Sequence, residues 1–367
     1  MIMQTFESRR HREPIGQILF CLFSAAVILA SLWFWYRSRS SDDLLNQAIQ
    51  NNLISATGQT DASDTPSDPD AAAPVLIHLR AADELSLAFQ YYDKLQESQT
   101  PPEGAFPVLS RDLSGKPSGG EILINNQTSY HPDAQSLLAL PVSAGTDGLS
   151  DPDQPLVLIL HTHGTEAYRP ETGLWYTQEQ ASFRSNDPEN NVVAVGAVMQ
   201  KVFGENGISS IHCTVMHDAE SYNDSYRLAA QTIQKYIREY PSIRYVFDIH
   251  RDAITGDDNS VIRCVTDADG KPVAQVMLVA GTNEKGADHP NWEQNLALAV
   301  RLQTVLNRRY ADLARPISLR GASYNQNYTN GSLLIEIGST GNTLEEAKAS
   351  AALTAQALSD IIGGESQ

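Results

Sequence analysis

Cysteine is scarce in this chain of 367 residues, which contains only three. None of them stands in a Cys-x-x-Cys pair, so a zinc site built on thiolates is not expected. Cys21 lies in an apolar N-terminal segment, whereas Cys213 and Cys264 belong to the globular part. These two either pair in an oxidising compartment or stay as free thiols. The absence of a disulfide-like spacing favours free thiols.

Basic residues are also few. Lysine and arginine number 26 against 44 aspartates and glutamates, which gives a formal net charge of −18. Because phosphate backbones are bound by clustered lysine and arginine, this deficit argues against a nucleic-acid partner. An acidic surface most simply serves solubility. The apolar content of 41% and the mean hydropathy of −0.29 are typical of a globular protein with a disordered or membrane appendage.

One long uncharged run stands near the N-terminus. Residues 18–35 carry no charge over 18 positions, which is near the shortest length that spans a bilayer. Arginines flank the run on both sides, and aromatic residues end it as an interfacial belt would. We therefore expect a cytoplasmic N-terminus at 1–17, a single-pass anchor in the cell membrane at 18–36 and an extracytoplasmic catalytic part. A cleaved signal peptide is the alternative, although its apolar core would be shorter.

The segment 37–120 is expected to be an extracytoplasmic tether and a partly helical linker. Its stretch 60–70 is composed mainly of Asp, Ser, Thr and Pro, and cannot bury enough apolar surface to fold. Residues 75–99 have helical character, and 107–120 is a loose segment rich in Gly, Pro and Ser. A catalytic domain is then expected at 121–367.

The regular part of the chain alternates strands with helices. This alternation predicts an α/β fold with a mixed, twisted sheet flanked by helices. The expected strands are 121–125, 156–160, 208–215, 245–249 and 333–337, with a hairpin across 261–279; the expected helices are 135–140, 192–203, 225–240, 292–310 and 343–362. Thr343 followed by Glu346 is the signature of a capping box that opens the last helix.

Titratable side chains accompany three of the expected strands. The sequence HTHGTE at 161–166 directly follows one strand, DIHRD at 248–252 ends a second, and Glu336 interrupts a third. Loops at the carboxyl ends of strands are where ligands bind in α/β sheets. Histidine and glutamate are zinc ligands, and catalytic zinc sites use three protein ligands plus a water. The three strand ends therefore predict one shared active site.

The relative placement of these side chains follows from strand geometry. His163 lies two residues after His161, so both point to one side of an extended segment and either can reach a metal. Glu166 is placed to bring a carboxylate back to the same ion. Asp248 shares a strand face with His250 and is expected to orient its imidazole. A single histidine here is usually structural, so the joint occurrence carries the hypothesis.

Glu336 is the most unusual single residue, because its neighbours Leu333, Leu334, Ile335 and Ile337 are all apolar. An unpaired buried carboxylate is costly, so it needs a metal-bound water or an arginine as its partner. Desolvation would raise its pKa and suit it to proton transfer. The alternative is an alternating strand with Glu336 facing solvent.

Three further residues are candidates for contact with a substrate. Arg251 is placed to stabilise an oxyanion or a substrate carboxylate, or else it forms a local ion pair with Asp252. Asn325 and Gln326 lie in a polar run before the strand of Glu336. They either bind a peptide backbone or build a simple turn, and a turn is the default for such a run.

Several motifs together resemble the stage II sporulation protein P family, the membrane-anchored sporulation amidases of endospore-forming bacteria. They run in order from 121 to 362 and comprise LILHTHGTEAY at 158–168, NVVAVG at 191–196, HD at 217–218, YN at 222–223, SY at 225–226, FDIHRDA at 247–253, YNQ at 324–326, GSLLIEIG at 331–338 and NTLEEA at 342–347. The resemblance does not extend to the tether.

The resemblance implies a fold like that of cell-wall zinc amidases and a zinc-dependent N-acetylmuramoyl-L-alanine amidase activity on peptidoglycan. Carried over by motif, His161 and His250 would be zinc ligands and Glu336 the catalytic carboxylate, with Arg251 assisting. Glu166 is the preferred third ligand; His163 either replaces it or, like Asp248, orients the ligands.

The same resemblance implies a place in sporulation and a partner. The enzyme would act at the outer face of the cytoplasmic membrane during engulfment, together with a lytic transglycosylase like stage II sporulation protein D. Two other functions remain open on the same site, a peptidoglycan endopeptidase and a non-catalytic wall-binding scaffold.

Overall fold

A computed structural model describes most of the chain from residue 100 onward. The described residues are 76–79, 100–117, 121–141, 151, 153–170, 173–177 and 183–364, all within one compact unit. The expected cytoplasmic segment, the anchor at 18–36 and most of the tether lie outside them. Among the helices in these described ranges, none combines the length and apolar character needed to cross a membrane.

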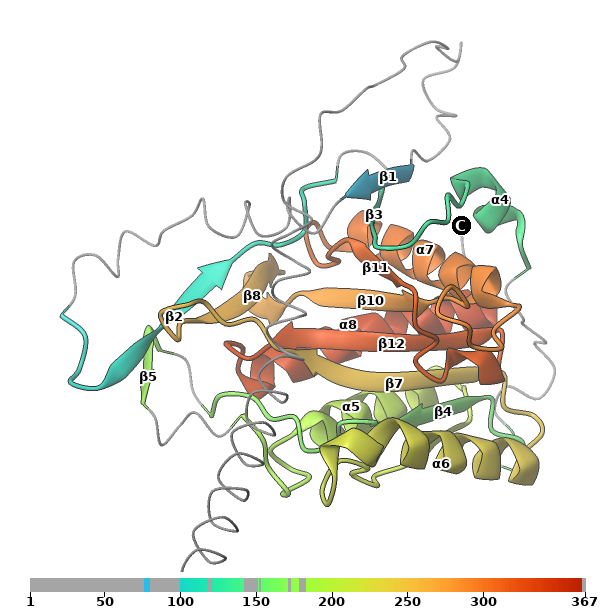
Figure 1. Cartoon of the computed structure of the whole chain (residues 1–367), viewed down its shortest axis with the longest axis horizontal. Helices are drawn as coiled ribbons and strands as arrows, with labels where there is room; N and C mark the ends of the chain where they lie inside the picture. Colours follow the sequence, from blue (N-terminus) through green and yellow to red (C-terminus); the bar gives the residue numbers. More distant parts are fainter. Residues whose placement is uncertain are drawn as a thin grey trace, which may run out of the picture. The chain divides into compact units, whose positions relative to one another are not determined.

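The main body of the fold is a sheet of eight strands in the order β1-β3-β11-β10-β12-β7-β4-β6 (Figure 1). These strands are β1 (Leu76–Leu79), β3 (Ile122–Asn126), β4 (Val157–Leu160), β6 (Ser210–His212), β7 (Tyr245–Asp252), β10 (Val276–Gly281), β11 (Ile317–Arg320) and β12 (Gly331–Ser339). All neighbours are parallel except β10 and β12, which are antiparallel. The predicted mixed sheet is confirmed, and β4, β7 and β12 all point their carboxyl ends to one edge.

Helices cover the two faces of this sheet unequally. They are α4 (Ala134–Ala139), α5 (Val192–Glu205), α6 (Ser225–Glu239), α7 (Trp292–Arg309) and α8 (Leu344–Gly363). Side chains of α5, α7 and α8 pack with Ile159, Phe247 and Ile335 on one side, called here the α5 face. Ala229 and Ile233 of α6 pack with alternate strand residues on the other side, the α6 face. Each strand of the central sheet therefore presents successive residues to different helices.

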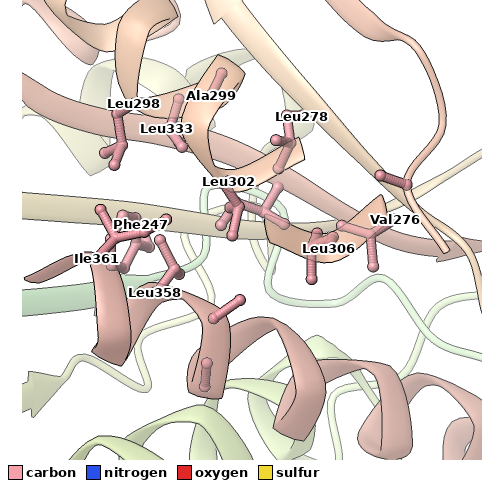
Figure 2. Close-up of a cluster of buried hydrophobic side chains, with 14 of the residues drawn as sticks. Phe247, Val276, Leu278, Leu298, Ala299, Leu302, Leu306, Leu333, Leu358 and Ile361 are labelled. Carbon is pink, nitrogen blue, oxygen red and sulfur yellow. The ribbon is translucent and has the colours of Figure 1, made fainter. Parts of the chain in front are cut away.

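The core on the α5 face consists of aliphatic side chains from both layers. Figure 2 shows Phe247, Leu278 and Leu333 of the sheet against Leu302 of α7 and Leu358 of α8. Burial of an aliphatic or phenyl side chain of this size contributes roughly 1.5–3 kcal/mol each. This layer fixes the positions of β7, β10 and β12 relative to one another.

A second, four-stranded sheet contains the first clear departure from expectation. Its order is β5-β2-β8-β9, with β2 (Ala105–Arg111), β5 (Trp175–Thr177), β8 (Val261–Ala268) and β9 (Lys271–Ala274). The expectation of a loose segment at 107–120 is wrong for 107–111, because β2 pairs with β8 and buries Val108 and Leu109. Partners distant in sequence thus outweigh the local Gly, Pro and Ser content that predicted a loop.

Other elements agree with the sequence to within a few residues, with three exceptions. Residues 76–79 form strand β1 beside β3 rather than part of a helix. The hairpin joins β8 to β9, but β10 leaves it and enters the large sheet. Strands β5 and β11 were not predicted, since each is short. The capping box at Thr343 and Glu346 is confirmed.

The two cysteines of the described part do not pair. Neither Cys213 nor Cys264 forms a disulfide bond, and both are buried in separate hydrophobic clusters. The favoured expectation that the two thiols stay reduced is confirmed for this structure.

A glutamine side chain completes the sheet where β3 extends beyond its partner β11. Gln303 of α7 is fully buried, and its Oε1 accepts a hydrogen bond from the Leu123 amide at 2.9 Å. Its Nε2 donates to the carbonyls of Leu123 and Arg315, both at 3.0 Å. One amide group thus replaces a missing stretch of strand and connects helix to sheet.

We expect Gln303→Leu to destabilise the fold by about 2 kcal/mol or more, because it leaves three buried backbone groups without partners. Gln231→Leu on the exposed side of α6 is the control and should change stability by less than about 0.5 kcal/mol. Urea denaturation of both variants measures the difference. Equal stability of the two would contradict this role of Gln303.

Candidate active site

The site lies where β4, β7 and β12 end side by side. In the register of the sheet, Glu336 of β12 stands opposite His250 of β7, and Leu160 of β4 stands opposite Asp248. Residues that are far apart in sequence are therefore neighbours at one edge. The expected convergence of the three strand ends is observed.

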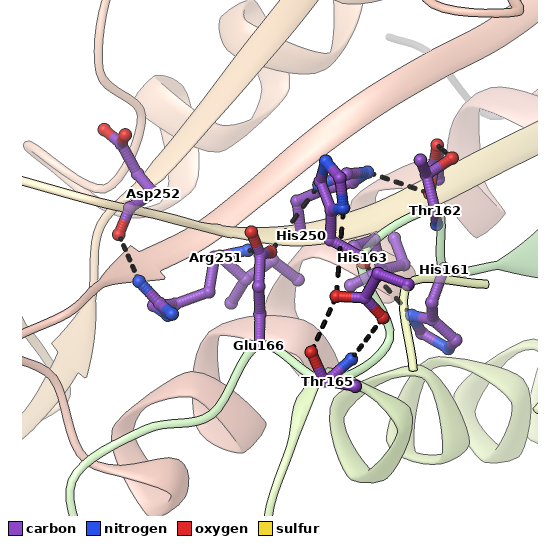
Figure 3. Close-up of polar contacts among 12 residues, drawn as sticks. His161, Thr162, His163, Thr165, Glu166, His250, Arg251 and Asp252 are labelled. Atoms are coloured by element: carbon purple, nitrogen blue, oxygen red, sulfur yellow. Dashed lines mark hydrogen bonds and ion pairs between the residues drawn. The ribbon is translucent and has the colours of Figure 1, made fainter. Parts of the chain in front are cut away.

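His163, Glu166 and His250 form the centre of the site (Figure 3). The rings of His163 and His250 meet edge to face, with centroids 5.4 Å apart. Glu166 Oε2 lies 3.5 Å from His250 Nδ1 and accepts a hydrogen bond from the Arg251 amide at 2.9 Å. All three residues are more than nine-tenths buried. Two imidazoles and a carboxylate thus share one water-poor space.

Asp248 supports this centre from the same strand as His250. Its carboxylate accepts hydrogen bonds from the amide and the hydroxyl of Thr162, at 2.8 and 2.6 Å. Asp248 Oδ1 also lies 3.0 Å from His250 Nε2. This is where an imidazole-orienting residue was expected.

The charges of the centre favour a cation. Burial by itself would lower the pKa of His250, but the carboxylates of Asp248 and Glu166 hold that pKa well above 6.5. Burial likewise acts to raise the pKa of both carboxylates, yet His250 and neighbouring donors lower each to about 2. The two carboxylates thus keep His250 protonated. A divalent cation bound at the same place would compensate the same negative charges.

Glu336 completes the edge on the β12 side. Its Oε2 is buried and has no hydrogen-bond partner among the described residues. Burial raises the pKa of Glu336 to about 8, although the charge of His250 acts against this and that of Asp252 adds to it. Glu336 is the partly exposed residue of an otherwise buried strand, and its Oε2 is removed from solvent.

The donor set fits zinc in type. Within the described ranges, His163 Nδ1 and Glu336 Oε2 are buried atoms without a hydrogen-bond partner, which a metal and its water would satisfy. Imidazole nitrogen and carboxylate oxygen are both ligands of Zn²⁺. In the same ranges, no three His, Cys, Asp or Glu side chains are already gathered in the arrangement of a metal centre.

His161 lies apart from this centre, which differs from the expected set of ligands. Its Nδ1 donates to the carbonyl of Ile249 at 3.0 Å, so its Nε2 is the acceptor that faces His212 Nε2 at 2.8 Å. A Cβ on Gly196 of α5 would approach the His161 ring to 2.8 Å. Burial, with the neighbouring His212, lowers the pKa of His161 to about 3.

Strand alternation explains the separation of the two histidines. Leu158 and Leu160 of β4 pack on the α6 face, so His161 belongs to the α5 face with Ile159. Figure 3 shows its ring directed away from those of His163 and His250. The structure therefore brings His163 and Glu166 together with His250, and leaves His161 outside.

The three expected substrate-contacting residues are engaged with the protein. The guanidinium of Arg251 donates to Thr340 Oγ1 at 3.0 Å and to the Phe183 carbonyl at 2.9 Å. Gln326 is buried, and its amide bonds the backbone of Val279 and Gly281. These contacts hold loops in place. For Arg251 and Gln326, contact with a substrate stays a prediction.

Asn325 and its neighbour form an unusual backbone corner. Tyr324 and Asn325 are consecutive residues in the left-handed region, with φ of 49° and 57°. Asn325 Nδ2 donates to the carbonyl of Tyr226 at 2.8 Å. The side chain thus connects the loop before β12 to the start of α6.

Sequence reasoning missed several residues around His163. Tyr222 stacks on the His163 ring with centroids 4.3 Å apart, and Tyr226 meets it edge to face at 5.5 Å. Asp218 Oδ2 lies 3.8 Å from His163 Nδ1 and is bonded by Arg184 at 2.5 Å. Tyr222 and Tyr226 stand four residues apart, the spacing of one helix face, and this signal could have found them.

The phenol of Tyr226 is subject to the charges of the site. Burial raises its pKa well above 10, and the negative charge of Asp248 adds to this, with smaller contributions from Tyr324, Glu336 and Glu166. The hydroxyl therefore stays protonated across the neutral range.

Comparison with known proteins places this chain among relatives. The model of the family Stage II sporulation protein P matches residues 94–359. Stage II sporulation protein P of Bacillus subtilis (strain 168) is 26% identical over 220 residues, covering 57% of this chain and 51% of that protein. The match thus spans about half the length of that relative.

Two solved structures share a weaker likeness. N-acetylmuramoyl-L-alanine amidase AmiC2 of Nostoc punctiforme has a TM-score of 0.32 at 12% identity, covering 60% of this chain and 97% of that chain. The CwlD amidase from Clostridioides difficile, solved in complex with the GerS lipoprotein, has a TM-score of 0.35 at 13% identity, covering 57% and 96%. The family match extends over more than half of the chain, and this chain belongs to the Stage II sporulation protein P family.

Proposed function

We propose that this protein is a zinc-dependent N-acetylmuramoyl-L-alanine amidase that cleaves peptidoglycan during sporulation. One observation carries the proposal most strongly. Glu336 has a buried, unpartnered oxygen at the end of β12, opposite His250 and beside a cluster of imidazole and carboxylate donors. A carboxylate kept in that position at the expense of stability is typical of a proton-transfer residue.

His163, Glu166 and His250 are the residues that would hold zinc. A zinc ion bound there supplies Lewis-acid polarisation of a carbonyl and lowers the pKa of a water molecule. Asp248, held by Thr162, keeps the His250 ring in its orientation. This set replaces His161 of the sequence expectation by His163, because His161 belongs to the α5 face.

Glu336 acts as general base and then as general acid. Its raised pKa of about 8 lies near neutral pH, where a carboxyl group can both accept and return a proton. It takes the proton of the attacking water and gives it to the amine of the first stem-peptide residue as the amide bond breaks. The lactyl group of the glycan strand is released as a carboxylate.

The location and the partner of the protein follow as parts of the same proposal. The expected anchor at 18–36 would hold the domain at the outer face of the cytoplasmic membrane, next to the wall. A lytic transglycosylase like stage II sporulation protein D would trim glycan strands alongside it. The strong net negative charge of the chain argues against nucleic acid as a partner in this role.

Glu336→Gln should lower the rate of stem-peptide release by roughly 10²–10⁴-fold, since the amide cannot take a proton from water. The full-length chain is incubated with purified peptidoglycan, with and without a chelator, and the products are identified by mass spectrometry. Glu345→Gln, an exposed carboxylate at the start of α8, is the matched control and should remain active.

The products distinguish the proposed reaction from its alternatives. Free stem peptides and lactyl-terminated glycan that disappear with the chelator support the amidase. Cut cross-bridges would point to an endopeptidase. No cleavage by the wild type, even with added zinc and trimmed glycan, would sink the enzyme proposal in favour of a scaffold.

We expect His163→Ala to lose bound zinc and His161→Ala to retain it. His163 Nδ1 is buried and makes no hydrogen bond to a described residue, whereas both nitrogens of His161 are hydrogen-bonded within the fold. His161→Ala should instead lower stability by about 1–3 kcal/mol, because its partners are left unsatisfied. Zinc content by elemental analysis and thermal unfolding report the two effects separately.

The exposed His131 provides the control for this pair, as His131→Ala should change neither zinc content nor stability. Loss of zinc from a folded His161→Ala variant, with retention in His163→Ala, would restore the ligand set expected from the sequence.

A further inference from the structure

Tyr226 stands at the start of α6 with its ring against the active centre. It meets the His163 ring edge to face at 5.5 Å and the Tyr324 ring at 6.0 Å. The residue is half-buried. Its ring therefore packs beside the centre, and its hydroxyl lies within electrostatic reach of Glu336.

The hydroxyl of Tyr226 has no hydrogen-bond partner among the residues that the structure describes. This contrasts with Tyr168, whose hydroxyl donates to the Ile337 carbonyl at 2.9 Å, and with Tyr130, bonded to Asn283 at 2.8 Å. A half-buried phenol at a catalytic edge normally finds a partner for its polar end. The structure leaves this donor available to a ligand.

The backbone around Tyr226 is fixed from outside the helix. Asn325 donates to the Tyr226 carbonyl from a corner in which Tyr324 and Asn325 are both left-handed. Two consecutive left-handed residues that are not glycine cost free energy of order 1–3 kcal/mol each, and such strain collects at functional sites. The corner thus contacts the backbone of Tyr226, the residue whose ring meets His163.

We propose that the Tyr226 hydroxyl donates a hydrogen bond to the carbonyl oxygen of the scissile amide as negative charge develops there. This inference rests on the proposed amidase function. The phenol keeps its proton throughout: water adds to the carbonyl carbon, the carbon–nitrogen bond breaks, and Glu336 carries the proton to the leaving amine. Asn325 is a positioning residue that acts through Tyr226.

The other donors near the site are less suited to this role. Arg251 was the sequence candidate for the oxyanion, but its guanidinium is bonded to Thr340 and to the Phe183 carbonyl. Arg184 is bonded to Asp218 and Thr165. The Nε of Arg251 has no partner among the described residues, but it is buried and belongs to a guanidinium held by these contacts. Tyr226 differs from both arginines in being neutral, so that its donor needs no counter-charge.

Tyr226→Phe in the full-length chain should lower kcat by roughly 10²-fold, the effect of losing one donor to a developing oxyanion. KM should change by less than about threefold, because the bond strengthens only in the transition state. Zinc content should equal that of the wild type. The control is Tyr240→Phe at the far end of α6, about 20 Å away by helix geometry.

A transition-state analogue supplies a second readout. A phosphinate analogue of the lactyl-alanine amide should bind Tyr226→Phe weaker by about the same factor as the fall in kcat. If the substitution only disturbed the packing of the ring, the Tyr226→Phe variant would lose affinity for the analogue and for the substrate by the same factor.

Asn325→Asp tests the positioning role, since a carboxylate cannot donate to the Tyr226 carbonyl. It should lower kcat by about three- to tenfold in the wild-type background. In the Tyr226→Phe background it should lower kcat no further, because the hydroxyl that it positions is gone. Additive losses in the double variant would show that Asn325 acts independently.

The outcomes separate this inference from the proposed function. An inactive wild type would sink the amidase proposal itself. If the wild type is active and the Tyr226→Phe variant has the same kcat and the same affinity for the analogue, only the role of Tyr226 is overturned.

Discussion

The parallel pairing of β12 with β7, and of β7 with β4, is the constraint on which the site depends. It sets Glu336 opposite His250 and Leu160 opposite Asp248. Because successive residues of a strand face opposite sides, a slip of one residue would move Glu336 from the α6 face to the apolar α5 face. The core of α5, α7 and α8 opposes this slip, since Ile335 and Ile337 are packed there among aliphatic and aromatic side chains.

The same strand pairing brings several ionisable side chains together in a buried place. Asp248, Glu166 and Glu336 lie around His250, all with much of their surface removed from water. The fold keeps Glu166 and Asp248 ionised by hydrogen bonds and by His250, and leaves Glu336 with a raised pKa. The environments therefore shift the pKa values of chemically identical groups in opposite directions, which is what the proposed roles of cation binding and proton transfer need.

Much of this organisation could be read from the chain. Apolar runs and helical periodicity placed most strands and helices, and the three polar strand ends indicated one site. His161 lies apart from His163 and His250, because alternation continues from Leu160 into the loop and β4 places His161 under α5. Tyr226 and Asn325 come together across 99 positions, and local pattern contains no sign of such a contact.

The sequence by itself determined the fold class, the family and the types of residue available for chemistry, because these depend on hydrophobic period and on motifs that are local. Only the tertiary structure decided which histidine joins the centre, which donors are already bonded and which hydroxyl remains available. Those outcomes depend on strand order, register and the helix that covers each face. These are set by contacts between residues far apart in the chain, so that no single segment specifies them.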